Sequence, residues 1–335
     1  MSSADLVAGL LWVSLTIYAV LAGADFGGGV WDMLASGPRA AEQRRAVAAA
    51  MGPVWEANHV WLIFMNVGLF TAFPIAYASL ANQLYLPLTL ALVGIVLRGA
   101  AFVFRAHGRE SIGPLTGWGA VFGAASIVAP FFLGTAAAAV ADGAVRLGPN
   151  GGATAMFAGW TAPAAIVIGL FAVSLCAYLA ATYLTVETAG HAELEADFRR
   201  RAIWAGLVSG GLALLALLVV GLQAPRLLES LAGRGLPLLI LAIVNGPLAV
   251  WAVWRSRPRI ARAAVIAQVV LVLWAWVVGQ WPYLVPPDLT IAGAAAPSGT
   301  LSAMLVVVPA GMVLLLPSLW LLFRVFKSRN PAAGY

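Results

Sequence analysis

The segment at residues 51–66, MGPVWEANHVWLIFMN, places ionisable and amide side chains inside an otherwise apolar run. A charged group at the centre of a membrane helix costs roughly 2.5–3.5 kcal/mol on insertion scales, so such residues usually face protein or water and have a function. Glu56, His59, Ile63 and Asn66 recur at intervals of three and four residues, which places them on one face of a helix. We therefore predict that this polar stripe faces the protein interior.

Glu56 and His59 have the chemistry needed to load and pass protons, with Asn58 beside them as a hydrogen-bonding group. A carboxyl group in a low-dielectric site holds its proton more tightly, and an imidazole exchanges protons near neutral pH. Residues three apart on a helix can also share a hydrogen bond that only fixes helix packing. The sequence leaves both roles open.

A second polar site lies in GADFGGG at residues 23–29, near the end of the first apolar segment. Asp25 has two candidate roles, as a helix-terminating residue at the membrane interface or as a buried protonatable group. The three glycines that follow weaken the helix and let another backbone approach closely. Asp32, beyond them, is expected in a solvated loop. No Gly-Lys-Ser/Thr follows, which excludes a phosphate-binding loop.

Arg98 is the third polar feature, inside the third apolar segment. It either extends to the membrane surface or pairs with Asp25 or Glu56. The chain has only three histidines and one cysteine, so a bis-histidine heme and a zinc site are excluded, and we expect no metal. A single axial heme ligand, His59, remains an alternative.

Composition identifies the class of protein in which these residues work. The 335 residues are 62% hydrophobic and 10% charged, with a mean hydropathy of +0.94, whereas soluble domains are about 45–50% apolar. The composition therefore predicts that the chain is a polytopic membrane protein. The net charge of +6 reflects basic residues at one membrane face, so we expect no nucleic-acid partner.

Nine apolar segments are long enough to span a membrane, which takes about 20 residues each. We predict an all-α protein with one integral-membrane domain over residues 1–335, in which the first eight helices form two four-helix bundles and the ninth is peripheral. The acidic-then-basic run at 187–201 is expected to form a short solvated helix between spans. The predicted spans are 6–26, 53–74, 77–101, 117–140, 158–184, 202–223, 235–254, 262–282 and 301–324.

The basic residues predict the orientation of these spans. With the N-terminus outside and the C-terminus cytoplasmic, all but Arg146, Arg226 and Arg234 of the 19 lysines and arginines fall on the inner side. Cytoplasmic loops carry such an excess. Removing one span would reverse every later loop and destroy the asymmetry, so the pattern also supports nine spans.

The polar segments resemble subunit II of cytochrome bd-type quinol oxidases. GADFGGG at 23–29 is similar to the family's D-G-F-D-x-G-x-G, and GPVWEANHVWL at 52–62 to its G-P-x-W-D-G-N-x-V-W-L. FPIAYASLANQLYLPLTLALVGIVLRGAAFVFR at 73–105 is similar to the family's aromatic-Pro-x-x-Tyr-Ala start and L-R-G-x-A-F-x-x-R end. The specific motifs cover about the first third of the chain; the remainder agrees in length, topology and helix number.

The resemblance implies a subunit of a terminal oxidase in the bacterial plasma (inner) membrane, in which quinol is oxidised and oxygen is reduced to water. It implies a partner, subunit I, that carries hemes b and d and the quinol site, with no heme in this chain but a structural quinone as an option. A small accessory subunit and membrane lipid are further implied partners. This chain would support subunit I and conduct protons from the cytoplasm through a pathway at Asp25, Glu56, Asn58, His59 and Arg98.

Several positions depart from the family pattern. Ala22 and Val103 stand where the family often has acids, and Ala57 and His59 replace the usual Gly and Gln or Glu. The resemblance therefore assigns no role to positions 22 and 103 and indicates a divergent branch. The alternative from another class is a proton- or ion-coupled secondary transporter with Asp25 and Glu56 as its ion sites, which would require broken helices near the midplane in paired halves.

Overall fold

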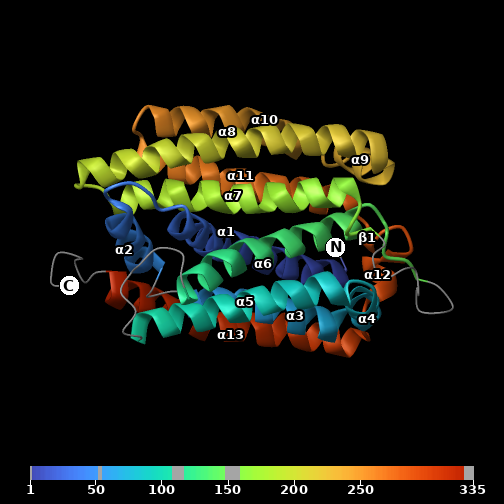
Figure 1. The fold of residues 1–335 in the computed structure, drawn as a ribbon. Helices are drawn as coiled ribbons and strands as arrows, with labels where there is room; N and C mark the ends of the chain where they lie inside the picture. Colours follow the sequence, from blue (N-terminus) through green and yellow to red (C-terminus); the bar gives the residue numbers. More distant parts are fainter. Residues whose placement is uncertain (1, 52–54, 108–116, 148–158, 328–335) are drawn as a thin grey trace.

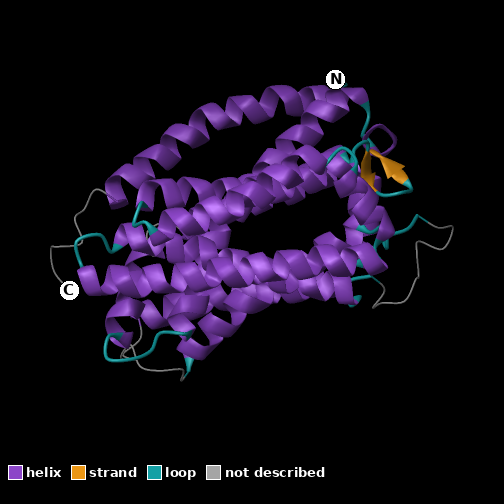
Figure 2. Ribbon diagram, turned by 90° about the horizontal axis from the view of Figure 1, so that it is seen from above, coloured by secondary structure: helices purple, strands orange, loops and turns teal. Residues whose placement is uncertain are grey.

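The computed structural model describes residues 2–51, 55–107, 117–147 and 159–327, which form a bundle of long helices (Figure 1). Turned by 90°, the bundle has its loops gathered at two ends, with a short hairpin at one of them (Figure 2). In chain order the elements are α1 (Ser3–Met33), α2 (Ala40–Met51), α3 (Trp55–Ala72), α4 (Pro74–Gln83), α5 (Tyr85–His107), α6 (Trp118–Ala141), α7 (Pro163–Glu187), α8 (Ala192–Gln223), α9 (Pro225–Ala232), α10 (Leu236–Trp254), α11 (Pro258–Gln280), β1 (Tyr283–Val285), β2 (Leu289–Thr290), α12 (Ile291–Ala294) and α13 (Ser298–Lys327).

Within the described ranges, eight helices are long and apolar enough to cross a membrane, and the bent pair α3–α4 makes nine if it counts as one span. The prediction of an all-α membrane protein with about nine spans is therefore confirmed. The predicted third span at 77–101 is wrong at its start. The chain bends by 118° between α3 and α4, and α5 begins only at Tyr85. Pro74 explains the break, because a proline suits the first turn of a new helix but disfavours helical backbone in the preceding residue.

The spans group as expected from their order. α5 packs on α6, and α1 packs on both α3 and α6, while α7, α8, α10 and α11 contact one another in a second set. α7 joins the sets through its contacts with α1 and α6, and α13 packs mainly against α1 and α3 at the periphery. The beginning of α1 and the strands lie at one end, and α2 lies at the other (Figure 1). Which end faces the cytoplasm stays a prediction.

Two glycines after Asp25 let α1 pack closely on α7 of the second set and on α6 of its own set. A Cβ on Gly27 would collide with the main-chain carbonyl of Cys176 in α7, and one on Gly29 would collide with the Ser126 hydroxyl in α6. The predicted close approach of another backbone is thus present. The predicted end of the helix at this point is not, since α1 continues to Met33.

The end of the molecule that carries the strands is held by an ion pair between two loops. Arg146 donates to both carboxylate oxygens of Asp288, at 2.8 and 3.0 Å, and the amide of Leu147 donates to the same carboxylate at 2.8 Å. Gln83, at the end of α4, exchanges two hydrogen bonds with the main chain of Arg146. The hydrogen bond from Arg146 holds the pKa of Asp288 below its ordinary value.

Candidate functional site

Three spans meet at Asp25, which is 4% exposed in the C-terminal half of α1. The side-chain amide of Asn58 in α3 donates to the Asp25 carboxylate, and Arg98 Nη2 in α5 donates to the main-chain oxygen of Asp25 at 3.2 Å. Asp25 therefore occupies the buried position considered above and does not terminate its helix. The structure brings together three of the five predicted site residues, and they come from three different helices.

Arg98 does not extend to the membrane surface. It is 1% exposed and the largest of the fully buried side chains in the described part of the protein. Its guanidinium lies over the rings of Phe26 and Phe122, with Cζ 5.4 and 5.3 Å from the ring centroids. Aromatic faces attract a cation, and more strongly where water is excluded, so these rings help to hold the charge inside the bundle.

A second acid–arginine pair lies two helical turns further along the same two helices. Arg105 donates two hydrogen bonds to the Asp32 carboxylate, at 2.9 and 3.1 Å, and its Cζ lies 5.2 Å from the centroid of the Phe122 ring. Asp32 is 4% exposed within α1, so its prediction as a solvated loop residue is wrong. The ring of Phe122 in α6 thus lies close to the guanidiniums of both Arg98 and Arg105.

Polar atoms around Asp25 and Arg98 can still form hydrogen bonds. Tyr18 Oη, Asn58 Oδ1 and Arg98 Nε are buried and form no hydrogen bond within the described part of the chain. The Tyr18 hydroxyl lies within electrostatic range of both Arg98 and Asp25. A buried polar group without a partner costs about 1–3 kcal/mol, so a set of three is suited to binding water beside the carboxylate.

His59 lies half-buried at the edge of this cluster. Its ring centroid is 5.9 Å from that of Tyr18 and 6.3 Å from that of Phe26, so two aromatic rings of α1 pack against it. Glu56 belongs to the first turn of α3, but its side chain lies outside the described residues, and the predicted pairing of Glu56 with His59 stays a prediction.

The predicted orientation of the polar stripe on α3 is wrong for its second half. Ile63 is 61% exposed and Asn66 is also exposed on the outer surface of the chain. The face that packs on α1 contains Asn58, Trp61 and Gly68 instead: the Trp61 carbonyl accepts a 2.8 Å hydrogen bond from Ser14, and a Cβ at Gly68 would collide with a leucine of α1. Close packing on a small residue, together with one internal amide, sets the rotation of the helix.

Asp32, Arg105, Tyr18 and Phe122 are the site residues that the sequence analysis missed. One signal was present: Asp25 and Asp32 are seven residues apart, as are Arg98 and Arg105, and seven residues are close to two helical turns. Within the described residues no group of three or more His, Cys, Asp or Glu side chains could hold a metal ion.

The fold and site define a class: an integral-membrane helical protein that holds two acid–arginine pairs inside its spans. The family model for cytochrome bd terminal oxidase subunit II matches residues 3–326. The chain therefore belongs to that family, and the resemblance inferred from the motifs is confirmed.

Individual relatives agree with the family. The chain is 29% identical over 208 residues to the cytochrome bd-I ubiquinol oxidase subunit 2 of Escherichia coli K12, a match that covers 60% of this chain and 52% of the relative. It is 35% identical over 92 residues to the cytochrome bd ubiquinol oxidase subunit 2 of Bacillus subtilis, covering 28% of this chain and 27% of the relative. These matches thus span about half or less of each relative's length. The solved structure of bd oxidase from Geobacillus thermodenitrificans has a chain with the same fold, with a TM-score of 0.80, 24% identity and coverage of 98% and 100%.

Proposed function

We propose that this chain is the non-heme subunit of a terminal oxidase complex that oxidises quinol and reduces oxygen to water. Its family membership supports an oxidoreductase complex with a partner subunit I. We further propose that hemes b and d lie in that partner and that a quinone, if held by this chain, is structural. His59, the one histidine within the described membrane spans, packs against two aromatic rings, which favours a packing or proton-relay role over heme ligation.

The observation that carries the proposal is the file of polar groups along α1 and α5. It begins at the Asp32–Arg105 pair, closer to the end of the bundle where α2 lies, which we call the arginine-rich end, and continues to Asp25, Asn58 and Arg98. The Asn58 and Tyr18 oxygens beside Asp25 can accept hydrogen bonds from water. We propose that protons from the cytoplasm reach Asp25 along this file and pass by His59 toward the partner.

The outward face of α3 supports the position of that partner. Asn66 is exposed between Ile63 and Val67, which are themselves 61% and 55% exposed. An amide in lipid lacks hydrogen-bond partners, and polar side chains in membranes usually meet another helix. We propose that subunit I covers this face of α3, so that His59 lies between Asp25 and the subunit that carries out the redox reaction. The small accessory subunit and the bacterial inner membrane are part of the same proposal.

The test is Asp25→Asn in the chain expressed together with its partner. The amide keeps the shape of the side chain but cannot take up and release a proton, so we expect quinol-dependent oxygen uptake to fall at least tenfold with an unchanged heme spectrum. Glu42→Gln is the control, because Glu42 is an exposed acid in α2 outside the cluster. Wild-type turnover in Asp25→Asn would leave Asp25 a structural role only.

The secondary-transporter alternative is not favoured. The family model matches nearly the whole chain, and the one bent pair of helices in the described residues bends at the end of α3 that leads to α4, away from Asp25. Paired breaks near the midplane, which inverted-repeat transporters use, are thus missing from the described spans.

A further inference from the structure

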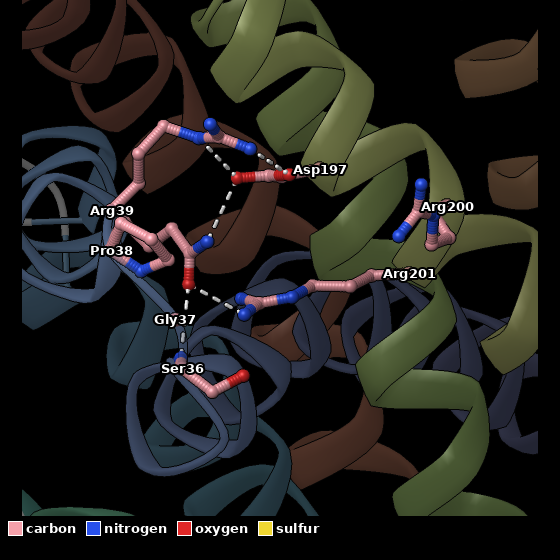
Figure 3. A pocket seen from close by; sticks show the side chains of 8 residues that line it. Ser36, Gly37, Pro38, Arg39, Asp197, Arg200 and Arg201 are labelled. Atoms are coloured by element: carbon pink, nitrogen blue, oxygen red, sulfur yellow. Dashed lines mark hydrogen bonds and ion pairs between the residues drawn. The ribbon is translucent and has the colours of Figure 1, made fainter.

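A cavity of about 270 Å³ lies outside the buried cluster, between the turn that joins α1 to α2 and the beginning of α8 (Figure 3). It is at the arginine-rich end of the spans, where α2 lies (Figure 1). The residues that line it are Ser36, Gly37, Pro38, Arg39, Gln43, Asp197, Arg200 and Arg201. None of them belongs to the proposed proton file.

One side of the cavity is a hydrogen-bond network centred on Asp197. Arg39 donates through Nε and Nη2 to the two oxygens of Asp197, at 2.9 and 2.8 Å, and Gln43 donates to the same carboxylate at 2.9 Å. Arg39 also pairs with Glu193 at 2.9 Å. The carboxylate of Asp197 is thereby neutralised by a bidentate partner and has no need of a cation from solution.

Arg201 is joined to this network through Gln43 but forms no ion pair with a carboxylate of the described residues. Arg201 donates from Nη2 to the Gln43 side-chain oxygen at 2.6 Å, and its Cζ lies 5.4 and 5.5 Å from the ring centroids of Trp31 and Phe198. Its Nη1 is buried and forms no hydrogen bond within the described part of the chain. Arg200, next to it, likewise forms no hydrogen bond or ion pair with the described residues.

The charge balance of the lining favours an anion. Three guanidiniums line the cavity together with a single carboxylate, and that carboxylate is already paired. The Arg201 guanidinium is held in place by two rings and by Gln43, so little conformational entropy is lost when it binds a ligand. Guanidiniums bind tetrahedral oxyanions through several charge-assisted hydrogen bonds.

We propose that this cavity binds a phosphate group, with Arg200 and Arg201 as its principal donors. At the membrane end of the spans the group comes from the headgroup of an anionic phospholipid or from phosphate in solution; the recognition chemistry is the same. Because the cavity joins the α1–α2 turn to α8, a bound phosphate would tie the first set of helices to the second. This goes beyond the proposed oxidase function and does not depend on it.

The test uses the purified complex with its partner, exchanged into phosphatidylcholine nanodiscs. One arm counts phosphatidylglycerol molecules retained per complex by native mass spectrometry, and the other measures binding of radiolabelled inorganic phosphate by equilibrium dialysis. Arg200→Gln is the main variant, since it removes a donor without breaking a hydrogen bond in the described structure. Arg201→Lys is the second variant, because lysine keeps the positive charge but lacks the planar guanidinium with its paired donors. Arg259→Gln is the control: Arg259 is exposed on the same arginine-rich side and does not line the cavity.

We expect Arg200→Gln to weaken the binding about tenfold, the typical effect of losing one charge-assisted hydrogen bond, while Arg259→Gln binds as the wild type does. A loss confined to the lipid arm identifies a headgroup site, and a loss confined to the dialysis arm identifies a soluble phosphate site. Binding that is unchanged in both Arg200→Gln and Arg201→Lys would overturn the proposal, as would an equal loss in Arg259→Gln.

Discussion

Replacing Gly27 by alanine tests whether close packing at α1 joins the two sets of helices. The alanine Cβ would overlap the carbonyl group of Cys176 and lie 2.7 Å from the Cβ of Ala180, both in α7. A flexible side chain could move aside, but a carbonyl within a helix cannot move without its backbone. The substitution must therefore push α1 and α7 apart.

The magnitude follows from two opposing effects. Alanine is favoured over glycine in a helix interior by about 1 kcal/mol. Overpacking a close-packed site costs about 1–3 kcal/mol, and more where backbone has to move. Because the obstacle here is backbone, we expect the upper part of that range and a net destabilisation of about 2 kcal/mol.

Two other glycines of the same helix are matched controls. A Cβ on Gly9 would meet nothing within 4 Å, so Gly9→Ala should be neutral or slightly stabilising. A Cβ on Gly23 would meet Cys176 and Leu179 side chains at 3.5 Å, an ordinary contact, so Gly23→Ala should be tolerated. The measurement is the thermal unfolding midpoint of the purified complex in one detergent. A Gly27→Ala midpoint equal to that of Gly9→Ala would refute the argument.

Two further predictions concern the ion pairs at either end of the molecule. Asp32→Asn and Arg105→Gln should each destabilise the protein by about 3 kcal/mol. This is the lower end of the range for broken buried pairs, because the Arg105 side chain is 20% exposed. In a double-mutant cycle of unfolding midpoints, the double variant should lose much less stability than the sum of the two single variants. The pKa of Asp288 is depressed, so its contribution to stability is complete above the unfolded pKa of about 3.9 and is lost as the pH falls through the lower folded value. Protection of the Leu147 amide from hydrogen exchange, corrected for the intrinsic rate, should fall in that pH range. Asp288→Ala, which removes the acceptor, should already lack that protection at neutral pH.

The number of spans could be predicted because hydropathy and the distribution of basic residues are independent signals that agree. The burial of Asp32 inside α1 could not be predicted, because three glycines before it favour the end of a helix. Glycine weakens an isolated helix, but here it permits contact with α6 and α7, and tertiary packing outweighs propensity. The same contact explains why α1 remains helical as far as Met33.

The orientation of α3 was mispredicted for a different reason. Insertion costs require polar side chains to avoid lipid, but they do not tell whether the protein that shields them belongs to the same chain. The Asn58 side-chain amide donates a hydrogen bond to Asp25 within the chain, whereas Asn66 faces outward. The ion pairs of Arg39 were beyond local pattern analysis as well, since helix spacing suggests only neighbours three or four residues away and Asp197 is 158 positions distant.

The order of the two acid–arginine pairs also decides how α3 crosses the membrane. By length and composition, the bent pair α3–α4 could be either a broken span or a re-entrant loop. A re-entrant loop would return the chain to its side of entry, and α5 would then run antiparallel to α1. The earlier acid of α1 contacts the earlier arginine of α5, and the later acid contacts the later arginine, so the two helices run in the same direction. One complete crossing must lie between them. The 18 residues of α3, at 1.5 Å each, extend about 27 Å, close to the hydrocarbon thickness of about 30 Å. α3 is therefore the full span, and α4 follows it at the end of the molecule that carries the strands.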